Sequence, residues 1–592
     1  MRDCFKIDGS IISRVAKFAV HGSTGRSAIT RKEALTRSAK SMRNACPICI
    51  FALLCVAPLG KITAAPSPDE ARTSREQMQD MQALWQVQQH ESRQKSLQQS
   101  VPASESPTVE TGHGAACLPW ETVEVRGLDL LSARQKRTLF DALHTDCVTA
   151  EKLGALTRLI AAMFLEQGYF RINLDQGHVG RALIWTVRTA KVAAIRNDTS
   201  MNTASLFPGL IGKPVNVHDL DQGLEQANRL PGHRVTMDVY PDQSGDVILA
   251  LSDVTTGAVH GSMGWNSLGS GRTGRAQVDA EISLSNLVGL ADSLTINVTS
   301  TLHTEPSYYN RSAGALYTVP YGRWTFSALG GASAYRTSTA LAIHTVRLDG
   351  GSWFAGLRGE YVLSRDGTHI SSAYGQLTRE VVESRFMGTA VALQGASLST
   401  VAIGLNHTAL FDGNALGANF EYKQGLPWLG ADKDVPGSGL PVSQFRKLAT
   451  SLSWSHAYRI SSLVVRFDHE LAAQYSADNL PSIEQIGITD RGTVRGFRDT
   501  YLTGDYGFYL HQTATSPLHV ASVALSPYIG LDAGRARQRG GEWQGAISGT
   551  IGVTLDRKPW SANIALSQGR AFAQFSGDAC ETEFMTQVHA SF

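Results

Sequence analysis

The sequence reads Thr493-Val494-Arg495-Gly496-Phe497-Arg498 near the C-terminal end of a long region of predicted strands. Gly and Asp residues on both sides indicate turns, and the flanking segments alternate apolar and polar residues. Repeated alternation is typical of a membrane barrel, whose strands have one lipid-facing and one water-facing side. In such a wall Arg495 has no place in lipid, so we expect it to face water or a carboxylate inside the barrel.

A candidate carboxylate lies further along the chain, in Gly530-Leu531-Asp532-Ala533-Gly534. An arginine can bind a carboxylate through two parallel hydrogen bonds, which makes the pair strong and geometrically specific. We predict that Arg495 and Asp532 hold the loop inside the barrel, with Gly496 allowing close backbone approach and Phe497 adding an apolar contact. The alternative is a surface loop with a solvated arginine.

The region from about residue 257 to 592 reads as strand, turn, strand. At about 20 residues per strand and connection, its length predicts a closed transmembrane β-barrel of about 16 antiparallel strands. Closure is required because an open edge in lipid leaves backbone groups unpaired. The last strand ends on an apolar residue, Phe592, on the same face as Phe584 and Val588.

Two smaller α+β units precede the barrel. Residues 115–190 predict a strand at 123–125, a helix at 132–143, a second helix capped by Thr149, and strands at 169–174 and 183–187. Residues 191–256 predict a helix at 220–231 followed by strands at 234–240 and 247–251. Cys117 and Cys147 flank the first unit, so we expect a disulfide between them in an oxidising compartment, the alternative being two buried thiols.

The N-terminal part of the chain divides into a leader and a polar helix. Residues 1–65 have the layout of an extended secretory signal peptide, in which a short apolar segment follows a basic region; Met42 is an alternative start. Residues 66–114 begin with a helix-start pattern at Ser67, continue as a Gln-rich helix to about residue 99, and end in a flexible tether. The helix carries only a thin apolar stripe, which suits solvent or a water-filled lumen. Its members are Met78, Met81, Leu84 and Trp85.

Several stretches together resemble a known family. The stretches that carry the resemblance are Val-Arg-Gly-Phe at 494–497, Gly-x-Asp-x-Gly at 530–534, the Gly-Tyr pair at 168–169, the run from Gly223 to Pro231 and the terminal Phe592. Together they resemble the outer-membrane transporters of two-partner secretion, the TpsB type of the Omp85 superfamily. The resemblance implies two periplasmic POTRA domains, a plug helix that occupies the pore, and a loop pinned inside the barrel. It also implies Phe592 as the signal read by the barrel assembly machinery.

The resemblance further implies a function. Such a protein exports one large secreted partner of the TpsA type, a haemolysin or adhesin, across the outer membrane, with outer-membrane lipid around its barrel. Its POTRA domains would bind the unfolded partner, with Tyr169, Arg171 and Arg229 as candidate contacts. A barrel-assembly insertase shares the loop motif and is the alternative; a passive porin would lack POTRA domains.

Composition and motifs argue against other classes. The formal net charge is +2, from 54 basic and 52 acidic residues, so no basic surplus indicates nucleic acid. Gly269 to Gly274 spell G-x-G-x-x-G, but a strand rather than a helix is expected next, so the segment is predicted to be a turn. His90-Glu91 lacks a second histidine at Gln94, and no histidine spacing selects a catalytic triad. We therefore expect no cofactor, no metal site and no catalytic residues.

Overall fold

The computed structural model describes the protein after its first 92 residues, with gaps. The described residues are 93–95, 97–98, 116–143, 147–302, 308–340, 345–390, 395–435, 437, 439–573 and 578–592. All of them belong to one compact unit, Pro66–Phe592. The predicted signal peptide and the apolar stripe of the predicted plug helix lie outside the described residues. Within these ranges, no helix has the length and apolar character that crossing a membrane requires.

Two small α+β units have the same topology. In each, the first strand is parallel to the last strand, which is central, and the middle strand pairs antiparallel on its other side. The first unit contains β1 (Thr122–Arg126), α3 (Ala133–Leu143), α4 (Ala150–Glu166), β2 (Ile172–Val179) and β3 (Ala182–Thr189). The second contains β4 (Val192–Asp198), α5 (Thr203–Leu206), α6 (Val217–Asn228), β5 (His233–Pro241) and β6 (Val247–Thr255). The predicted order of elements in the first unit is confirmed.

Helix caps fix the elements of the first unit. The Thr149 side chain accepts a hydrogen bond from the backbone N–H of Lys152 and starts α4, as predicted. The predicted strand at 169 begins later, because the Tyr169 N–H still bonds the Phe164 carbonyl at 2.9 Å and completes the end of the helix.

The core of the unit centres on Trp185, Phe164 and Ile160. The predicted disulfide between Cys117 and Cys147 is present, with Cα atoms 5.6 Å apart.

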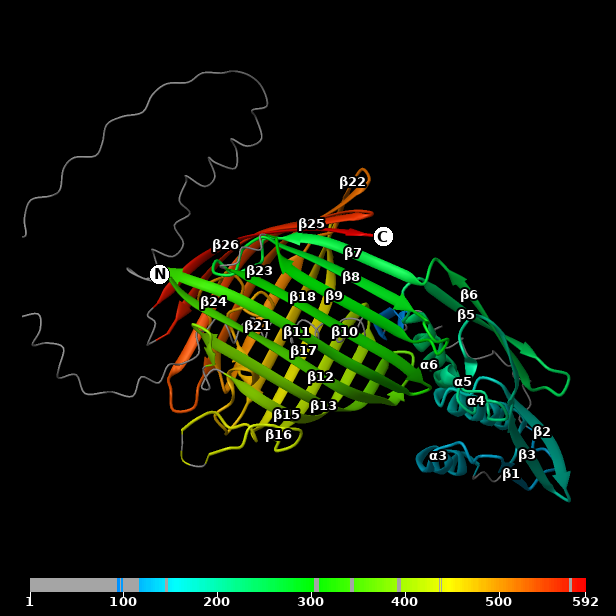
Figure 1. Cartoon of the computed structure of the whole chain (residues 1–592). Coiled ribbons are helices and arrows are strands. Elements are labelled where there is room, and N and C mark those ends of the chain that lie inside the picture. The colour runs from blue at the N-terminus through cyan, green and yellow to red at the C-terminus, as the bar shows by residue number, and fades with distance from the viewer. Residues whose placement is uncertain are drawn as a thin grey trace, which may run out of the picture. The chain divides into compact units, whose positions relative to one another are not determined.

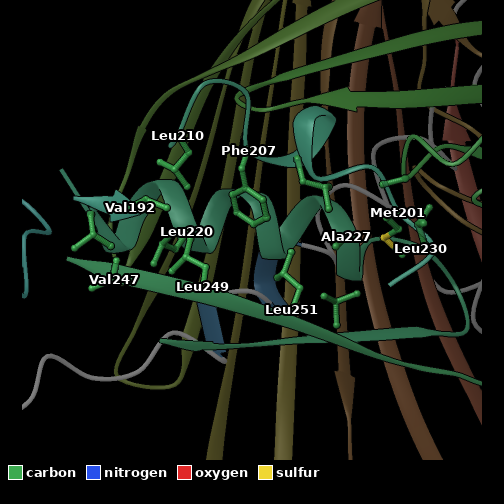
Figure 2. Packing of buried hydrophobic residues seen from close by; sticks show 14 of the residues in the cluster. Val192, Met201, Phe207, Leu210, Leu220, Ala227, Leu230, Val247, Leu249 and Leu251 are labelled. Carbon is green, nitrogen blue, oxygen red and sulfur yellow. The ribbon is translucent and has the colours of Figure 1, made fainter. Parts of the chain in front are cut away.

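The second unit is built around α6. The helix starts at Val217, a turn earlier than predicted, because the Asn216 side chain caps it by accepting from the His218 N–H. It ends before Pro231, which disfavours helix in the residue ahead of it. Figure 2 shows Phe207 against α6, and Leu249 and Leu251 pointing to the helix from the sheet.

The remaining residues form a closed barrel. Eighteen described strands belong to it, of which β14 (Thr389–Ala390) and β22 (Leu518–Val520) only extend hairpins, so sixteen strands pass around the wall. Figure 1 shows them side by side, with the last strand next to the first. They are β7 (Val259–Asn266), β8 (Gln277–Ser285), β9 (Ser293–Thr301), β10 (Tyr309–Tyr321), β11 (Trp324–Ala340), β12 (Thr345–Arg365), β13 (His369–Phe386), β15 (Ala396–Phe411), β16 (Asn414–Leu426), β17 (Arg446–Ile460), β18 (Leu463–Tyr475), β21 (Tyr506–Thr515), β23 (Val523–Arg537), β24 (Trp543–Arg557), β25 (Trp560–Phe572) and β26 (Ala579–Ser591).

The wall of the barrel inverts the usual burial of side chains. Leu531 is 66% exposed and Ile296 is 41% exposed, whereas their neighbours Asp532 and Thr295 are 5% and 6% exposed. Apolar residues on the outside and polar residues inside fit a wall between lipid and a polar lumen. The predicted fold, a 16-stranded barrel of this kind, is confirmed.

The glycine-rich segment is a turn, as predicted, and the C-terminal residue takes part in the closure of the barrel. Residues 269–274 form a turn, in which the Gly274 N–H bonds the Ser270 carbonyl, and strand β8 follows. Phe592 is 75% exposed, and its backbone closes the barrel through hydrogen bonds with Gly261 of 2.9 and 3.0 Å.

Gly223, inside α6, should resist replacement. A Cβ there would lie 2.0 Å from Phe207 Cε1, so Gly223→Ala must displace a core ring and should destabilise the second unit by about 1–3 kcal/mol. Hydrogen exchange of the α6 amides in the full chain would measure this.

Gly154→Ala in α4 is the matched control, because nothing lies within 4 Å of the new methyl group. It should slow exchange of α4, since alanine favours helix over glycine by about 1 kcal/mol. Equal effects of the two substitutions would contradict the role assigned to Phe207.

Candidate functional site

The connection between β18 and β21, residues 476–505, folds back along the inner wall of the barrel. Its two arms pair through β19 (Ile486–Gly487) and β20 (Thr503–Gly504), and a 3₁₀ turn (Ser482–Glu484) precedes them. Between the arms, an apolar side of the loop packs against small side chains on β23, β24 and β25. This cluster consists of Ile488, Val494, Phe497, Leu502, Ala536, Ala546 and Ala571, each at most 4% exposed. We name residues 476–505 the pore loop.

Arg495 and Asp532 form the pair that the sequence predicted. Arg495 Nε donates to Asp532 Oδ2 at 2.8 Å, and Nη2 donates to Oδ1 at 2.7 Å. The Arg495 backbone N–H also donates to Oδ2, at 3.2 Å, and Ser548 Oγ donates to the same oxygen at 2.9 Å. Arg495 Nη2 also donates to the Gln512 carbonyl at 2.8 Å, and Nη1 donates to Thr513 Oγ1 at 3.3 Å. Both charges are therefore buried with most of their hydrogen-bonding capacity used.

Glycines on the wall make room for the loop. A Cβ at Gly530 would lie 2.0 Å from Arg495 Nη2, and one at Gly569 would lie 2.5 Å from the Phe497 ring. At Gly534 it would meet Ile488 at 3.1 Å. The glycines of the Gly-x-Asp-x-Gly motif thus clear the wall on both sides of Asp532. Gly496 has φ +88° and its Cβ position lies 2.9 Å from the Gly569 backbone nitrogen, so both its conformation and its surroundings require glycine.

A second ionic contact holds the beginning of the pore loop. Glu484 accepts from Lys423 Nζ on β16 at 2.5 Å and lies 2.6 Å from Lys447 Nζ on β17. The glutamate side chain is 2% exposed, and the two lysine side chains are 9% and 11% exposed. Removing one member would leave a buried charge without its partner, which is costly. Sequence reasoning missed this triad, because the three residues lie in separate segments with no shared motif.

A third contact holds the far end of the pore loop against the last strand. Glu581 on β26 accepts from the backbone N–H groups of Arg498 at 2.7 Å and Asp499 at 3.0 Å, and from Thr500 Oγ1. The Arg498 side chain pairs with Glu583 at 3.4 Å. Sequence reasoning missed Glu581 and Glu583; their alternation with exposed Phe584 was the available sign that they face inward.

Residues of the predicted plug segment also lie in the lumen. Residues 93–95 and 97–98 are helical. Arg93 Nη2 donates to Glu360 Oε1 on β12 at 2.5 Å and to Ser372 Oγ on β13 at 3.1 Å. Leu97 packs against Val362 and Ile370 of the same two strands. The described residues of this segment are thus attached to the wall through the buried Arg93–Glu360 ion pair and through the apolar packing of Leu97.

The second α+β unit contacts the turns at the near end of the barrel. Asp219 pairs with Arg323 at 2.8 Å, Glu225 pairs with Arg365, and Gln226 Nε2 donates to Thr325 Oγ1 at 2.9 Å. Helix α6 therefore binds β11, β12 and the turn before β11 through polar contacts. The predicted site residue Arg229 belongs to the same surface, since its Nη2 donates to the Ala291 carbonyl at 3.3 Å. Burial lowers the pKa of Arg229 to about 10, so it stays charged at neutral pH.

The other two residues predicted to bind a partner lie in the first unit. Tyr169 packs at the edge of the core, with its ring 6.2 Å from that of Phe164. Arg171 precedes the edge strand β2 and is partly exposed. The structure does not bring Tyr169 and Arg171 together with Arg229 in one site. Among the described residues, no group of His, Cys, Asp and Glu has a metal-binding arrangement.

Gly530→Ala should release the pore loop without changing any charge. The new methyl group would occupy the place of the Arg495 guanidinium, so the amides of residues 485–502 should exchange faster by a factor of about ten or more, the equivalent of the 1–3 kcal/mol cost of overpacking. Hydrogen exchange in detergent micelles would report this.

Gly549→Ala on the neighbouring strand β24 is the control, because nothing lies within 4 Å of its methyl group. If the loop amides are equally protected in both variants, the guanidinium does not hold the loop.

Comparison with known proteins agrees with this architecture. A family model described as haemolysin secretion/activation protein ShlB/FhaC/HecB matches residues 245–555, and a POTRA domain model matches residues 191–241. The hemolysin transporter protein ShlB of Serratia marcescens is 31% identical over 461 residues, covering 77% of this chain and 82% of that protein. The hemolysin transporter protein HpmB of Proteus mirabilis is 28% identical over 506 residues, covering 84% and 90%.

Solved structures show the same fold. CdiB from Escherichia coli covers 89% of this chain and 99% of its own, with a TM-score of 0.80 at 24% identity. CdiB from Acinetobacter baumannii gives a TM-score of 0.73 at 19% identity, covering 88% and 99%. With more than half of its length matched by the family model, the chain belongs to the ShlB/FhaC/HecB family of haemolysin secretion/activation proteins.

Proposed function

We propose that this chain is an outer-membrane transporter that recognises one large secreted protein, of the haemolysin or adhesin type, and moves it across the outer membrane. The observation that carries the proposal is a lumen occupied by elements that are attached to the wall through buried ionic contacts: Arg495 to Asp532, Glu484 to two lysines, and Arg93 to Glu360. Such contacts can be exchanged for water when the elements leave.

Relatives favour transport over membrane-protein insertion. ShlB and HpmB are named hemolysin transporters, and CdiB of Escherichia coli is named an outer membrane transporter. These relatives give no support to the alternative of a barrel-assembly insertase. We assign the barrel to the outer membrane and the POTRA units to the periplasm.

We propose a separate role for each part of the chain. Residues 1–65 direct export, residues 66–114 provide the plug and its tether, residues 115–190 and 191–256 are the POTRA domains, and residues 257–592 form the barrel. The exposed apolar side chains on the outside of the barrel wall would lie in outer-membrane lipid. Phe592, which is 75% exposed at the end of β26, suits recognition by the assembly machinery.

The secreted partner would bind the POTRA units through strand addition. In both sheets the middle strand in sequence order, β2 or β5, is an edge strand. An extended peptide can add to such an edge through main-chain hydrogen bonds. Arg171, next to the start of β2, suits direct contact with the partner. Tyr169 would support that edge from the core, and Arg229 would position the second unit on the barrel.

Arg495→Ala should leave the barrel assembled and reduce secretion at least about tenfold, because Asp532 then has no guanidinium from the pore loop to hold in place. The measurement is the amount of exoprotein in the medium when the chain is co-expressed with its secreted partner. Arg385→Ala is the control, since Arg385 forms an exposed pair with Glu383. Undiminished secretion by an assembled Arg495→Ala barrel would refute this role.

Glu360→Gln should loosen the plug, because Arg93 then loses its charged partner in the lumen. We expect a higher single-channel conductance in planar bilayers, approaching that of a variant lacking residues 66–99. Glu383→Gln on β13 should have no effect, because that carboxylate is 61% exposed and pairs with an exposed arginine. A conductance equal to that of the unaltered protein would show that the Arg93–Glu360 pair does not retain the plug.

A further inference from the structure

The seam that closes the barrel, between β26 and β7, is short. It contains five partner pairs, from Gln587–Asn266 to Ser591–Ser262. On either side of it, β25 and β26 share twelve pairs, and β7 and β8 share eight. The first seven residues of β26, at the end away from the C-terminus, pair with β25, and the described ladder to β7 does not extend to them.

The hydrogen bonds of the seam end at a definite place. The last backbone contact runs from the Ser267 N–H to the Thr586 carbonyl, at 2.9 Å. Carbonyls of alternate residues point to the same side of a strand, so the next carbonyl facing the seam is that of Phe584. It accepts a hydrogen bond from Arg498 Nη2, at 3.4 Å. A side chain of the pore loop therefore takes the position where the next rung from β7 would be.

The same part of the pore loop binds β26 through Glu581. This carboxylate accepts three hydrogen bonds from three consecutive loop residues, two of them from backbone N–H groups, at 2.7 and 3.0 Å from Arg498 and Asp499. Hydrogen bonds to a carboxylate are stronger than those between neutral groups.

The loop also reaches the other side of the seam. The position of a Cβ on Gly271, in the connection between β7 and β8, lies 3.9 Å from Asp499 Oδ1. The connection that follows β7 is thus in reach of the same loop residue whose N–H group bonds Glu581. Residues 498–500 consequently bind β26 and lie close to the connection that follows β7.

We propose that residues 498–500 of the pore loop fasten the seam of the barrel, with Glu581 as their receptor on β26. Beyond Thr586 the loop replaces the rungs that the ladder between the last and the first strand lacks. The pore loop then has two functions: it fills the lumen, and it stabilises the closure of the wall. Withdrawal of the loop loosens the seam where β26 precedes Thr586, at the end away from the C-terminus. This proposal does not depend on the export function, since it concerns the resting barrel.

Glu581→Ala in the full-length protein, in detergent micelles, tests the proposal by hydrogen exchange. Amides of residues 259–267 and 584–592 should exchange roughly tenfold faster, the loss expected for one charged hydrogen bond, whereas amides of the β12–β13 pair should not change. Glu581→Gln should have a smaller effect, because its amide oxygen still accepts N–H donors. Glu383→Ala, which removes an exposed carboxylate from β13, should leave the seam unchanged.

Two results would overturn the proposal. One is seam exchange that stays at its original rate while residues 498–500 lose protection, because the loop would then leave without loosening the wall. The other is equal acceleration of the seam and of β12–β13, which would indicate general destabilisation. If the Glu581→Ala variant does not assemble, Arg498→Ala, placed in the loop, allows the same measurement and should give the same pattern.

Discussion

Because the hydrocarbon layer contains no water, the charged groups at the middle of this wall must face inward, and this constraint organises the lumen. Asp532, Glu360 and Lys423 all lie on the inner side of strands whose outer side is apolar. Each is buried, so each needs a partner of opposite charge. Each has a partner from a segment that is not part of the wall: Arg495 and Glu484 from the pore loop, and Arg93 from the segment before the first α+β unit. Glu360 also pairs with Arg358 of its own strand, at 3.4 Å.

The contacts differ in what they require of the polypeptide. The Arg495–Asp532 pair is bidentate, so it fixes the orientation of the guanidinium as well as its position. Glu484 is held by two flexible lysine side chains, which tolerate a wider range of positions. The contacts of Glu581 are mostly with backbone N–H groups, which depend on the conformation of the loop and little on its side chains. Specific orientation is thus concentrated at one residue pair.

Local patterns in the sequence predicted much of this arrangement. Alternating strands predicted the barrel, caps such as Thr149 predicted the helices, and one arginine with one Gly-x-Asp-x-Gly segment predicted the central ion pair. The contacts of Glu484 and Glu581 could not be predicted, because they join segments far apart in the sequence and depend on the path of the loop through the lumen. The early start of α6 and the late start of β2 have the same kind of cause, since a single hydrogen bond to a backbone N–H group decided each: that of His218 to the Asn216 side chain, and that of Tyr169 to the Phe164 carbonyl.

The small side chains beneath the pore loop have a consequence for a polypeptide in transit. When the loop moves away, its own bulky groups, Ile488, Val494, Phe497 and Leu502, go with it, and the wall beneath them is alanine and glycine beside the polar Asp532 and Ser548. Favourable burial scales with apolar area, so such a surface offers an unfolded polypeptide little to adhere to. The vacated passage would therefore bind an unfolded polypeptide weakly, and an apolar segment of the secreted protein would pass along it without being retained.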